Sequence, residues 1–263
     1  MTTKDFQHTK GDIMKKMIVS AAVVALAGLS CSAFASGGGA HWGYTGHGGP
    51  EHWGDLAKEF QACKLGKMQS PIDLSAANVA SNVKVETTYK PVELEILNNG
   101  HTVQFNVGNG STLTAHGKIY DLLQIHFHTP SEHVVDGKPY PMEAHFVHKA
   151  KDGSLAVIGV LYKEGAENAA LKPVIANAPM KETKAAKKGV QINPADLLPG
   201  QQNFIRYMGS LTTPPCSEGV NWHVVPTAVE VSKAQIAEMA KAMGMNARPA
   251  QPANNRLVVE PAK

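Results

Sequence analysis

The sequence lacks a segment that would span a membrane, and it lacks a strong excess of charge of either sign. Its apolar run from Met17 to about Leu29 is too short to cross a bilayer core of ~30 Å comfortably. The formal net charge is only +3, which gives no reason to expect nucleic acid or another polyanion as a partner. No internal repeat and no linker-like stretch divides the 263 residues, so we expect one large domain.

The short apolar run is typical of a secretory signal peptide. Lys15 and Lys16 precede it, and small residues ending in Ala33-Phe34-Ala35 follow it. A basic start, a short apolar stretch and an A-x-A end mark such a leader, and residues 1–14 then form an upstream extension. We expect cleavage after Ala35, export to a periplasm or release from the cell, no membrane attachment after cleavage, and a mature domain of residues 36–263.

Removal of the leader would leave only two cysteines. Cys31 lies in the leader, and a lipid anchor on it is disfavoured because Gly28 stands where a larger apolar residue is expected. Cys63 and Cys216 remain, and two cysteines in an oxidising compartment predict a disulfide. In the chain-entropy model, a disulfide that closes such a long loop stabilises the folded protein by up to ~4–5 kcal/mol. The alternative is a pair of buried free thiols.

Helical patterns are sparse in the rest of the chain, and strand patterns dominate. Residues 168–178 fit a short helix, and Lys233 to Met243 fit a second, capped by Ser232 and ended by Gly244. The charged stretch from Lys181 to Lys188 predicts a solvated loop. Stretches that are β-rich or alternate in polarity, with Gly, Asn and Asp turns between them, predict strands at 83–89, 92–98, 102–107, 124–128, 143–149, 155–162 and 221–231, with Pro226 at an edge or a bend.

Two of these strands carry a pattern that favours a metal site. Gln124, His126 and His128 are spaced i, i+2, i+4, so they share one face of a strand. Glu143 and His145 repeat the pattern on a later strand, after a connection long enough to let the two strands pair. Three neutral imidazoles with an open fourth position are typical of a catalytic zinc site. The glutamine and the glutamate would each accept the outer N–H of the neighbouring imidazole.

Other interpretations of these histidines remain open. Two histidines at i, i+2 are also common on the solvent face of a strand, although Phe127 between them favours a strand with one buried face. His148 is the main rival as a ligand, but it follows His145 by three residues and so points to the other face. His116 and His133 are further rivals, and both lie nearer to predicted turns.

Nine short strings follow one another along the chain. They are His41-Trp42-Gly43-Tyr44, Gln69-Ser70-Pro71-Ile72, Asn98-Asn99-Gly100-His101, Gln124-Ile125-His126-Phe127-His128, Ser131-Glu132-His133, Glu143-Ala144-His145, Ser210-Leu211-Thr212-Thr213-Pro214-Pro215-Cys216, Asn221-Trp222 and Arg248-Pro249-Ala250-Gln251-Pro252. Taken in this order, they closely resemble the α-class carbonic anhydrases, particularly the exported bacterial ones. The resemblance implies a mainly β, single catalytic domain with a large central, mostly antiparallel, twisted sheet and a few short surface helices. It also implies reversible hydration of carbon dioxide to bicarbonate by zinc-bound hydroxide.

The resemblance also assigns a role to each matching position, and no catalytic position departs from the family pattern. It implies a proton shuttle at His101, a nucleophile-orienting hydroxyl at Thr212 and its acceptor at Glu132. The implied zinc ligands are His126, His128 and His145, with Gln124 and Glu143 hydrogen bonded to them; the implied substrate pocket is Val147, Val157, Leu211, Thr213, Val220 and Trp222; and the implied disulfide is Cys63 with Cys216.

Three other functions fit parts of the pattern. A zinc hydroxide would also cleave esters, but a pocket of Val and Leu side chains argues against a large substrate. A metal-free binding module on the same fold is expected to lack one of the ligand histidines, and all three are present. A periplasmic zinc buffer is expected to carry exposed His-rich tracts, whereas the histidines here are dispersed. Because homodimers occur among bacterial members, the resemblance also makes a homodimer one expectation.

Overall fold

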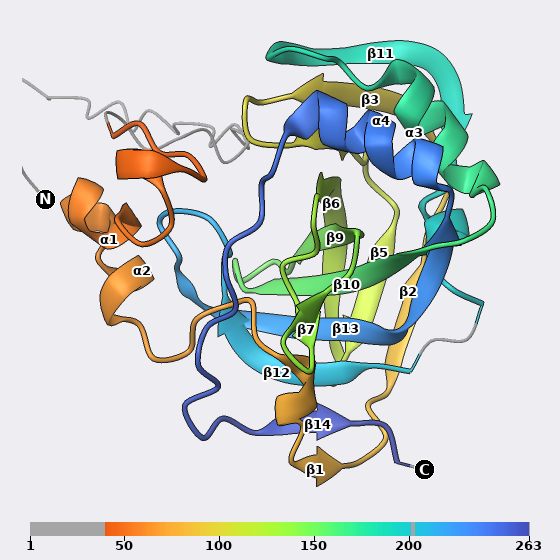
Figure 1. Ribbon diagram of the computed structural model, residues 1–263. Coiled ribbons are helices and arrows are strands. Elements are labelled where there is room, and N and C mark those ends of the chain that lie inside the picture. Colours follow the sequence, from red (N-terminus) through yellow and green to blue (C-terminus); the bar gives the residue numbers. More distant parts are fainter. Residues whose placement is uncertain (1–39, 201–202, 263) are drawn as a thin grey trace, which may run out of the picture. The chain divides into compact units, whose positions relative to one another are not determined.

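The computed structural model describes residues 40–200 and 203–262, so the predicted leader and its cleavage after Ala35 lie outside the described residues. Twelve strands form one large sheet in the order β1-β14-β12-β13-β10-β9-β6-β4-β3-β11, with β5 paired to both β6 and β2 (Figure 1). The strands of this sheet are β1 (Val79–Ala80), β2 (Val85–Thr88), β3 (Val92–Asn98), β4 (Val103–Asn106), β5 (Thr112–Ala115), β6 (Lys118–His128), β9 (Met142–Lys149), β10 (Leu155–Glu164), β11 (Thr183–Ile192), β12 (Ile205–Ser210), β13 (Glu218–Val231) and β14 (Val258–Glu260).

Short helices and one small hairpin complete the fold. The hairpin joins β7 (Val134–Val135) to β8 (Lys138–Pro139). Figure 1 shows α3 and α4 lying together beside β3 and β11, while α1 and α2 belong to the N-terminal segment. The helices are α1 (Trp53–Leu56), α2 (Ala62–Leu65), α3 (Lys172–Asn177) and α4 (Lys233–Met243), with 3₁₀ turns η1 (Gly46–Gly48), η2 (Lys58–Phe60), η3 (Leu74–Ala76), η4 (Ala169–Leu171) and η5 (Pro194–Leu197).

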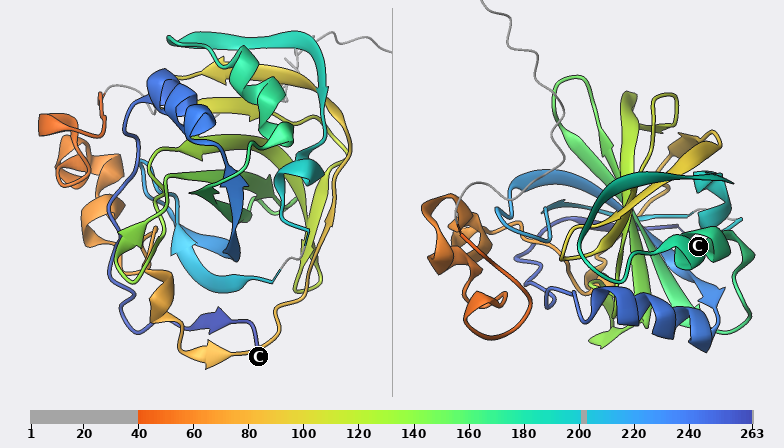
Figure 2. Two further views of the ribbon diagram at one scale, coloured as in Figure 1. Left: turned by 45° about the vertical axis from the view of Figure 1, so that its right-hand side comes forward. Right: turned by 90° about the horizontal axis from the view of Figure 1, so that it is seen from above.

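The pairings of the strands confirm the predicted mainly β fold with a mostly antiparallel sheet. Among the described strands, only β1 with β14 and β10 with β13 pair in parallel. The right-hand view of Figure 2 shows the strands fanning across one another as the sheet twists. The predicted strands correspond to β2, β3, β4, β6, β9, β10 and β13, and the predicted helix at 233–243 is α4, with Ser232 in a capping box and Gly244 as its C-cap.

The sequence prediction was wrong for the stretch from Lys181 to Lys188. In the structure, Thr183–Ile192 forms the edge strand β11, which pairs along one side with β3. Nearly every side chain of β11 is exposed, so the alternation of polarity that identifies a half-buried strand is absent. Lysines on such an edge discourage further strand pairing, which explains a charged strand at this position.

Pro226 lies at a bend rather than at an edge. Strand β13 is an interior strand, paired to β10 on one side and to β12 on the other. The register between β10 and β13 shifts after the pair Val160–Val225 and resumes at Tyr162–Val229, so the proline falls within the irregularity. A proline is tolerated there because its missing N–H is not needed by the ladder.

Apolar side chains form separate clusters on the two faces of the sheet. The larger cluster lies between one face and helices α3 and α4, and includes Phe105, Phe127 and Phe146. A second cluster, including Tyr207 and Trp222, lies on the other face. A third, smaller cluster holds the N-terminal segment in place around Trp42, Trp53, Phe60 and the two cysteines.

Candidate metal centre and active site

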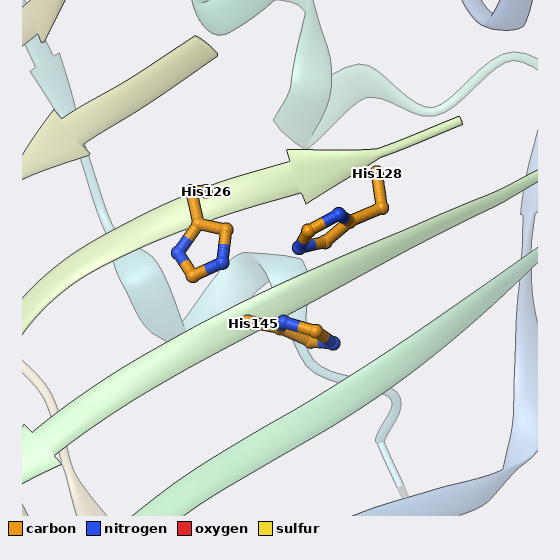
Figure 3. A group of neighbouring side chains, drawn as sticks. All are labelled: His126, His128 and His145. Carbon is orange, nitrogen blue, oxygen red and sulfur yellow. The ribbon is translucent and has the colours of Figure 1, made fainter. Parts of the chain in front are cut away.

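Antiparallel pairing of β6 with β9 brings the three predicted ligand histidines together. His126 of β6 is the direct cross-strand partner of His145 of β9, and His128 follows two residues along the same face. The ring centroids lie 5.0 Å apart for His126 and His128, 5.1 Å for His126 and His145, and 4.5 Å for His128 and His145. Figure 3 shows the three rings pointing toward one common space from the two adjacent strands.

Each of these rings has one nitrogen held by a protein group. The Nδ1 of His126 lies 2.8 Å from the Gln124 Oε1, and the Nδ1 of His128 lies 2.7 Å from the Asn246 carbonyl oxygen. The Nε2 of His145 lies 3.0 Å from Oε1 of Glu143. Since an amide oxygen, a carbonyl and a carboxylate can only accept, each held nitrogen is an N–H donor. The nitrogens left over are Nε2 of His126, Nε2 of His128 and Nδ1 of His145.

This arrangement fits a zinc ion. One ring nitrogen from each of the three histidines lies within 4.8 Å of the others, a spacing that small side-chain adjustments bring to tetrahedral coordination. The Nε2 of His128 is buried without a hydrogen-bond partner among the described residues, as expected for a nitrogen reserved for a metal. The Nε2 of His145 also lacks a well-aligned hydrogen bond, but the Glu143 carboxylate lies only 3.0 Å from it and leaves Nδ1 as the nitrogen that faces the other two rings. Burial lowers the pKa of all three imidazoles, to about 4 for His128, so the rings are neutral, as metal ligands must be.

Glu143 is the centre of a buried hydrogen-bond network behind the triad. Its Oε2 accepts from the backbone N–H groups of Glu132 and His133, both at 2.9 Å, and its Oε1 accepts from His133 Nδ1 at 2.7 Å. Burial alone would raise the pKa of this carboxyl, but the neighbouring imidazoles of His133 and His145, whose ring N–H groups face it, hold it well below its usual range. The ionised carboxylate therefore fixes the orientation of the His145 ring.

Sequence reasoning missed the role of His133, which it set aside as a histidine near a turn. The side chain is completely buried, with Nε2 lying 2.7 Å from the Tyr207 hydroxyl, which donates to Ser70 Oγ at 2.9 Å. His133, Glu143 and His145 also form a second cluster with metal-ligand spacing. Because His133 donates to Glu143 at 2.7 Å and His145 Nε2 lies 3.0 Å from the same carboxylate oxygen, that cluster is a polar network around the carboxylate instead. The position of His133 in the string Ser131-Glu132-His133 was the one available signal.

Glu132 and Thr212 lie beside the free nitrogens of the triad. Glu132 is buried, with Oε2 at 3.5 Å from His128 Nε2 and 3.8 Å from His145 Nδ1, while its Oε1 accepts from the backbone N–H of Arg248 at 2.9 Å. Burial raises its pKa to about 7, against smaller lowering effects from His145, Arg248 and the Thr212 side chain. The Oε2 of Glu132 has no hydrogen-bond partner among the described residues.

His101 lies between β3 and β4, in the turn that the string Asn98-Asn99-Gly100 predicts. Its ring stacks on Trp42 of the N-terminal segment, with centroids 3.8 Å apart and planes 6° from parallel. Partial burial and the nearby His41 lower the pKa of this imidazole, and Glu182 opposes the change. A half-buried imidazole with a pKa at or below its ordinary value exchanges protons readily near neutral pH.

The predicted apolar pocket residues gather next to the triad. The Trp222 ring meets His145 edge-on, with centroids 4.8 Å apart, and its indole N–H donates to the Ser210 carbonyl at 2.9 Å. Thr213 is not part of the apolar cluster; its carbonyl accepts from the backbone N–H of Cys216. The pocket residues that share one cluster with Trp222 are Val147, Val157, Val220 and, partly buried against it, Leu211.

A disulfide joins Cys63 of α2 to Cys216, at the end of the loop that carries Thr212. The sulfurs are 2.08 Å apart and the bond spans 153 positions of the sequence. Arg248 links this bond to the site, because its Nη2 donates to the Cys63 carbonyl at 3.0 Å and its backbone N–H donates to Glu132. The disulfide therefore ties the N-terminal segment to the loop beside the triad.

The other rival histidines lie away from the triad. His148 points to the opposite face of β9, as predicted, and its Nε2 lies 2.7 Å from the Tyr89 hydroxyl. His116 is exposed in the turn after β5, where its φ of 51° marks a left-handed conformation. In the part of the chain that the structure describes, no helix combines the length and apolarity needed to cross a membrane.

Comparison with known proteins places the chain in a family. The family model for eukaryotic-type carbonic anhydrases matches residues 48–262. The chain belongs to this α-class carbonic anhydrase family. A carbonic anhydrase of Nostoc sp. is 46% identical over 226 residues, which cover 84% of this chain and 86% of that protein. A carbonic anhydrase of Neisseria gonorrhoeae is 43% identical, covering 91% of this chain and 95% of the relative.

Solved carbonic anhydrase structures share the fold. A hyperthermostable carbonic anhydrase from an active hydrothermal vent chimney superposes with a TM-score of 0.81 at 48% identity, covering 84% of this chain and all of the other. The family and the fold that the sequence strings predicted are thus confirmed. The individual residue roles stay predictions, to which the geometry described above now gives distances and hydrogen-bond partners.

Proposed function

We propose that this chain catalyses the reversible hydration of carbon dioxide to bicarbonate and a proton, with one zinc ion held by His126, His128 and His145. One observation carries the proposal: three neutral imidazoles on two paired strands each keep a ring nitrogen directed at one common space. Membership in the carbonic anhydrase family supports the same reaction. Zinc, when bound, would lower the pKa of a coordinated water and so supply a nucleophile at neutral pH.

The residues behind the histidines would keep them ready for the metal. Gln124, Asn246 and Glu143 each engage the outer nitrogen of one ring, which fixes its tautomer and direction. Because these partners come from strands and from the segment just beyond α4, the three free nitrogens would not need to reorganise when the metal binds. Neutral rings at neutral pH would also leave no proton to be displaced.

Thr212 and Glu132 would orient the nucleophile. If Glu132 is ionised, it accepts the hydroxyl hydrogen of Thr212, and the Thr212 oxygen is then left to accept a hydrogen from the attacking water species. Burial keeps the pKa of Glu132 near 7, and a divalent cation close to its Oε2 would favour the ionised form. The apolar cluster around Trp222 would hold carbon dioxide, which carries no charge, opposite that oriented lone pair.

His101 would carry the released proton between the site and solvent. Its half-buried ring, stacked on Trp42, is accessible from outside while it remains ordered. A lowered pKa makes the protonated imidazole a stronger acid, so it would release the proton readily to buffer at neutral pH.

The test is metal analysis together with stopped-flow carbon dioxide hydration on the purified mature protein. We expect about one zinc per chain, loss of hydration after removal of the metal by a chelator, and recovery when zinc is returned. Full hydration by the metal-free protein would contradict the proposal, and so would a zinc-loaded protein without hydration. An activated ester, assayed in parallel, would measure the esterase alternative; ester cleavage without hydration would favour it.

We also propose that the protein works in the periplasm after export. The basic and apolar leader and the Cys63–Cys216 disulfide support an oxidising compartment. N-terminal sequencing of the protein from a periplasmic extract tests this, and the expected first residue is Ser36. Recovery of the uncleaved chain from the cytoplasm alone would contradict it.

A further inference from the structure

The sheet face opposite the histidine triad carries a second group of basic side chains. Arg206 of β12 and His223 of β13 are direct cross-strand partners. Their strand neighbours Tyr207 and Trp222 contact the His133 ring on the triad side, so alternation along each strand places Arg206 and His223 on the other face. The exposed His116, in the turn between β5 and β6, brings its ring centroid to 6.3 Å from that of His223.

His223 lacks the partners that a buried imidazole normally has. Its side chain is completely buried, yet neither ring nitrogen has a hydrogen-bond partner among the described residues. Buried polar atoms are nearly always paired, so such a ring indicates a group that belongs beside it. Burial, Arg206, His116 and His148 lower the pKa of His223 to about 3, against a smaller opposing effect of the Asn221 backbone. The neutral ring therefore has one N–H donor and one bare acceptor nitrogen.

Arg206 lacks a counter-ion. Its half-buried guanidinium donates from Nε to the Asn221 Oδ1 at 2.9 Å and from Nη2 to the Met208 sulfur at 3.5 Å. It forms no ion pair with any carboxylate in the residues that the structure describes. The charged groups near enough to shift the pKa values of Arg206, His116 and His223 are these residues themselves, His148 and Tyr120. None of these groups is an aspartate or a glutamate. A partly buried cation without a carboxylate favours a bound anion.

We propose that Arg206, His223 and His116 form a binding site for a small planar oxyanion. A guanidinium presents parallel N–H groups that match two oxygens of such an ion, and the neutral His223 adds one further donor. Bicarbonate fits better than nitrate, because its hydroxyl would donate to the bare nitrogen of His223. The preference for bicarbonate as the natural ligand rests on the proposed function, whereas the oxyanion site itself does not.

The site is tested by observing His223 directly in the zinc-loaded mature protein. With ¹⁵N-labelled histidine, the ring nitrogens are assigned by comparison with His223→Phe, and nitrate and then bicarbonate are titrated at constant ionic strength. We expect a saturable shift of the His223 nitrogens, weakened at least ~10-fold in Arg206→Gln because the charged donor is lost. Lys58→Gln, which removes one exposed positive charge on η2, is the control and leaves the shift unchanged.

Several results would overturn the proposal. They are no saturable shift of His223, equal affinity in Arg206→Gln, or crystals soaked in nitrate that show only water beside the His223 ring. If Arg206→Gln does not fold, Arg206→Lys keeps the charge but loses the planar fork, and we expect weaker binding in that variant too. The His223 signal reports on the sheet face opposite the triad. A failure of oxyanion binding can therefore be distinguished from a failure of carbon dioxide hydration.

Discussion

The two faces of strand β9 carry one histidine each, and the structure uses them in opposite ways. His145 lies with His126 and His128. In each of these three rings, one nitrogen contacts a protein group and the other faces the space between the rings. His148, three residues later, engages both nitrogens: Nε2 with the Tyr89 hydroxyl at 2.7 Å and Nδ1 with the Ala156 carbonyl at 3.3 Å.

The comparison shows that burial alone does not identify a metal ligand. Both faces are buried, and burial lowers the pKa of His145 and His148 alike. The difference lies in whether one nitrogen stays unengaged and whether such nitrogens converge.

Replacing His126 with Ala should abolish zinc binding and carbon dioxide hydration. Mutation of a residue that only hydrogen bonds to a metal ligand typically lowers metal affinity or activity by ~10–100-fold. Loss of a ligand itself should therefore lower both by more than ~100-fold. His148→Phe, on the opposite face of the sheet, is the matched control and should keep one zinc. Metal content by mass spectrometry and stopped-flow hydration decide the outcome, and a His126→Ala protein with zinc and full turnover would refute the ligand assignment.

Replacing Glu143 with Gln should weaken zinc binding by ~10–100-fold, because the His145 ring loses the carboxylate that orients it. Tyr89→Phe removes the corresponding partner of His148 and should leave zinc affinity unchanged. Competition with a chromophoric chelator measures both affinities. Equal affinities in the two variants would mean that the network behind the triad does not tune the metal.

Replacing His148 with Phe should make the protein less sensitive to acid. The folded-state pKa of His148 is about 3, below the ordinary value of 6.5, so only the unfolded chain gains this proton as the pH falls below about 6.5. Stability is therefore lost between about pH 6.5 and pH 3, with a slope of ~1.4 kcal/mol per pH unit from this one group. Urea unfolding across that range should give a shallower slope for the variant, and an unchanged slope would contradict the burial of a neutral ring.

Replacing His101 with Ala should slow hydration by ~10-fold in dilute buffer, at the lower end for a group that transfers protons. Added imidazole should restore the rate, because it takes over the proton transfer. His47→Ala removes an exposed histidine of the N-terminal segment and should change neither rate. A slow His101→Ala enzyme that imidazole fails to rescue would indicate a structural role in the stack with Trp42 instead.

Local periodicity predicted the triad because its geometry is local. In a strand, residues two apart share a face, so His126, His128 and Gln124 could be grouped from spacing alone. The connection to the strand of His145 was long enough to allow the two strands to pair, and the structure shows that they do. The same rule placed His148 on the other face, and the structure bears this out.

The parts that sequence reasoning missed depend on contacts that no local pattern encodes. The carbonyl that holds His128 belongs to Asn246, 118 residues later and beyond α4. His133 lies in the irregular segment between β6 and β7 yet is completely buried, because Glu143 and Tyr207 enclose it from two other strands. Strand β11 was missed because an exposed edge strand pairs through its backbone and needs no apolar face.

Anomalous diffraction at the zinc absorption edge tests the central claim most directly. Crystals of the purified protein should show one strong peak within ~2.0–2.1 Å of Nε2 of His126, Nε2 of His128 and Nδ1 of His145, with a fourth position open to solvent. No peak between these rings, or a peak coordinated by His145 through Nε2 together with His133 and Glu143, would contradict the account.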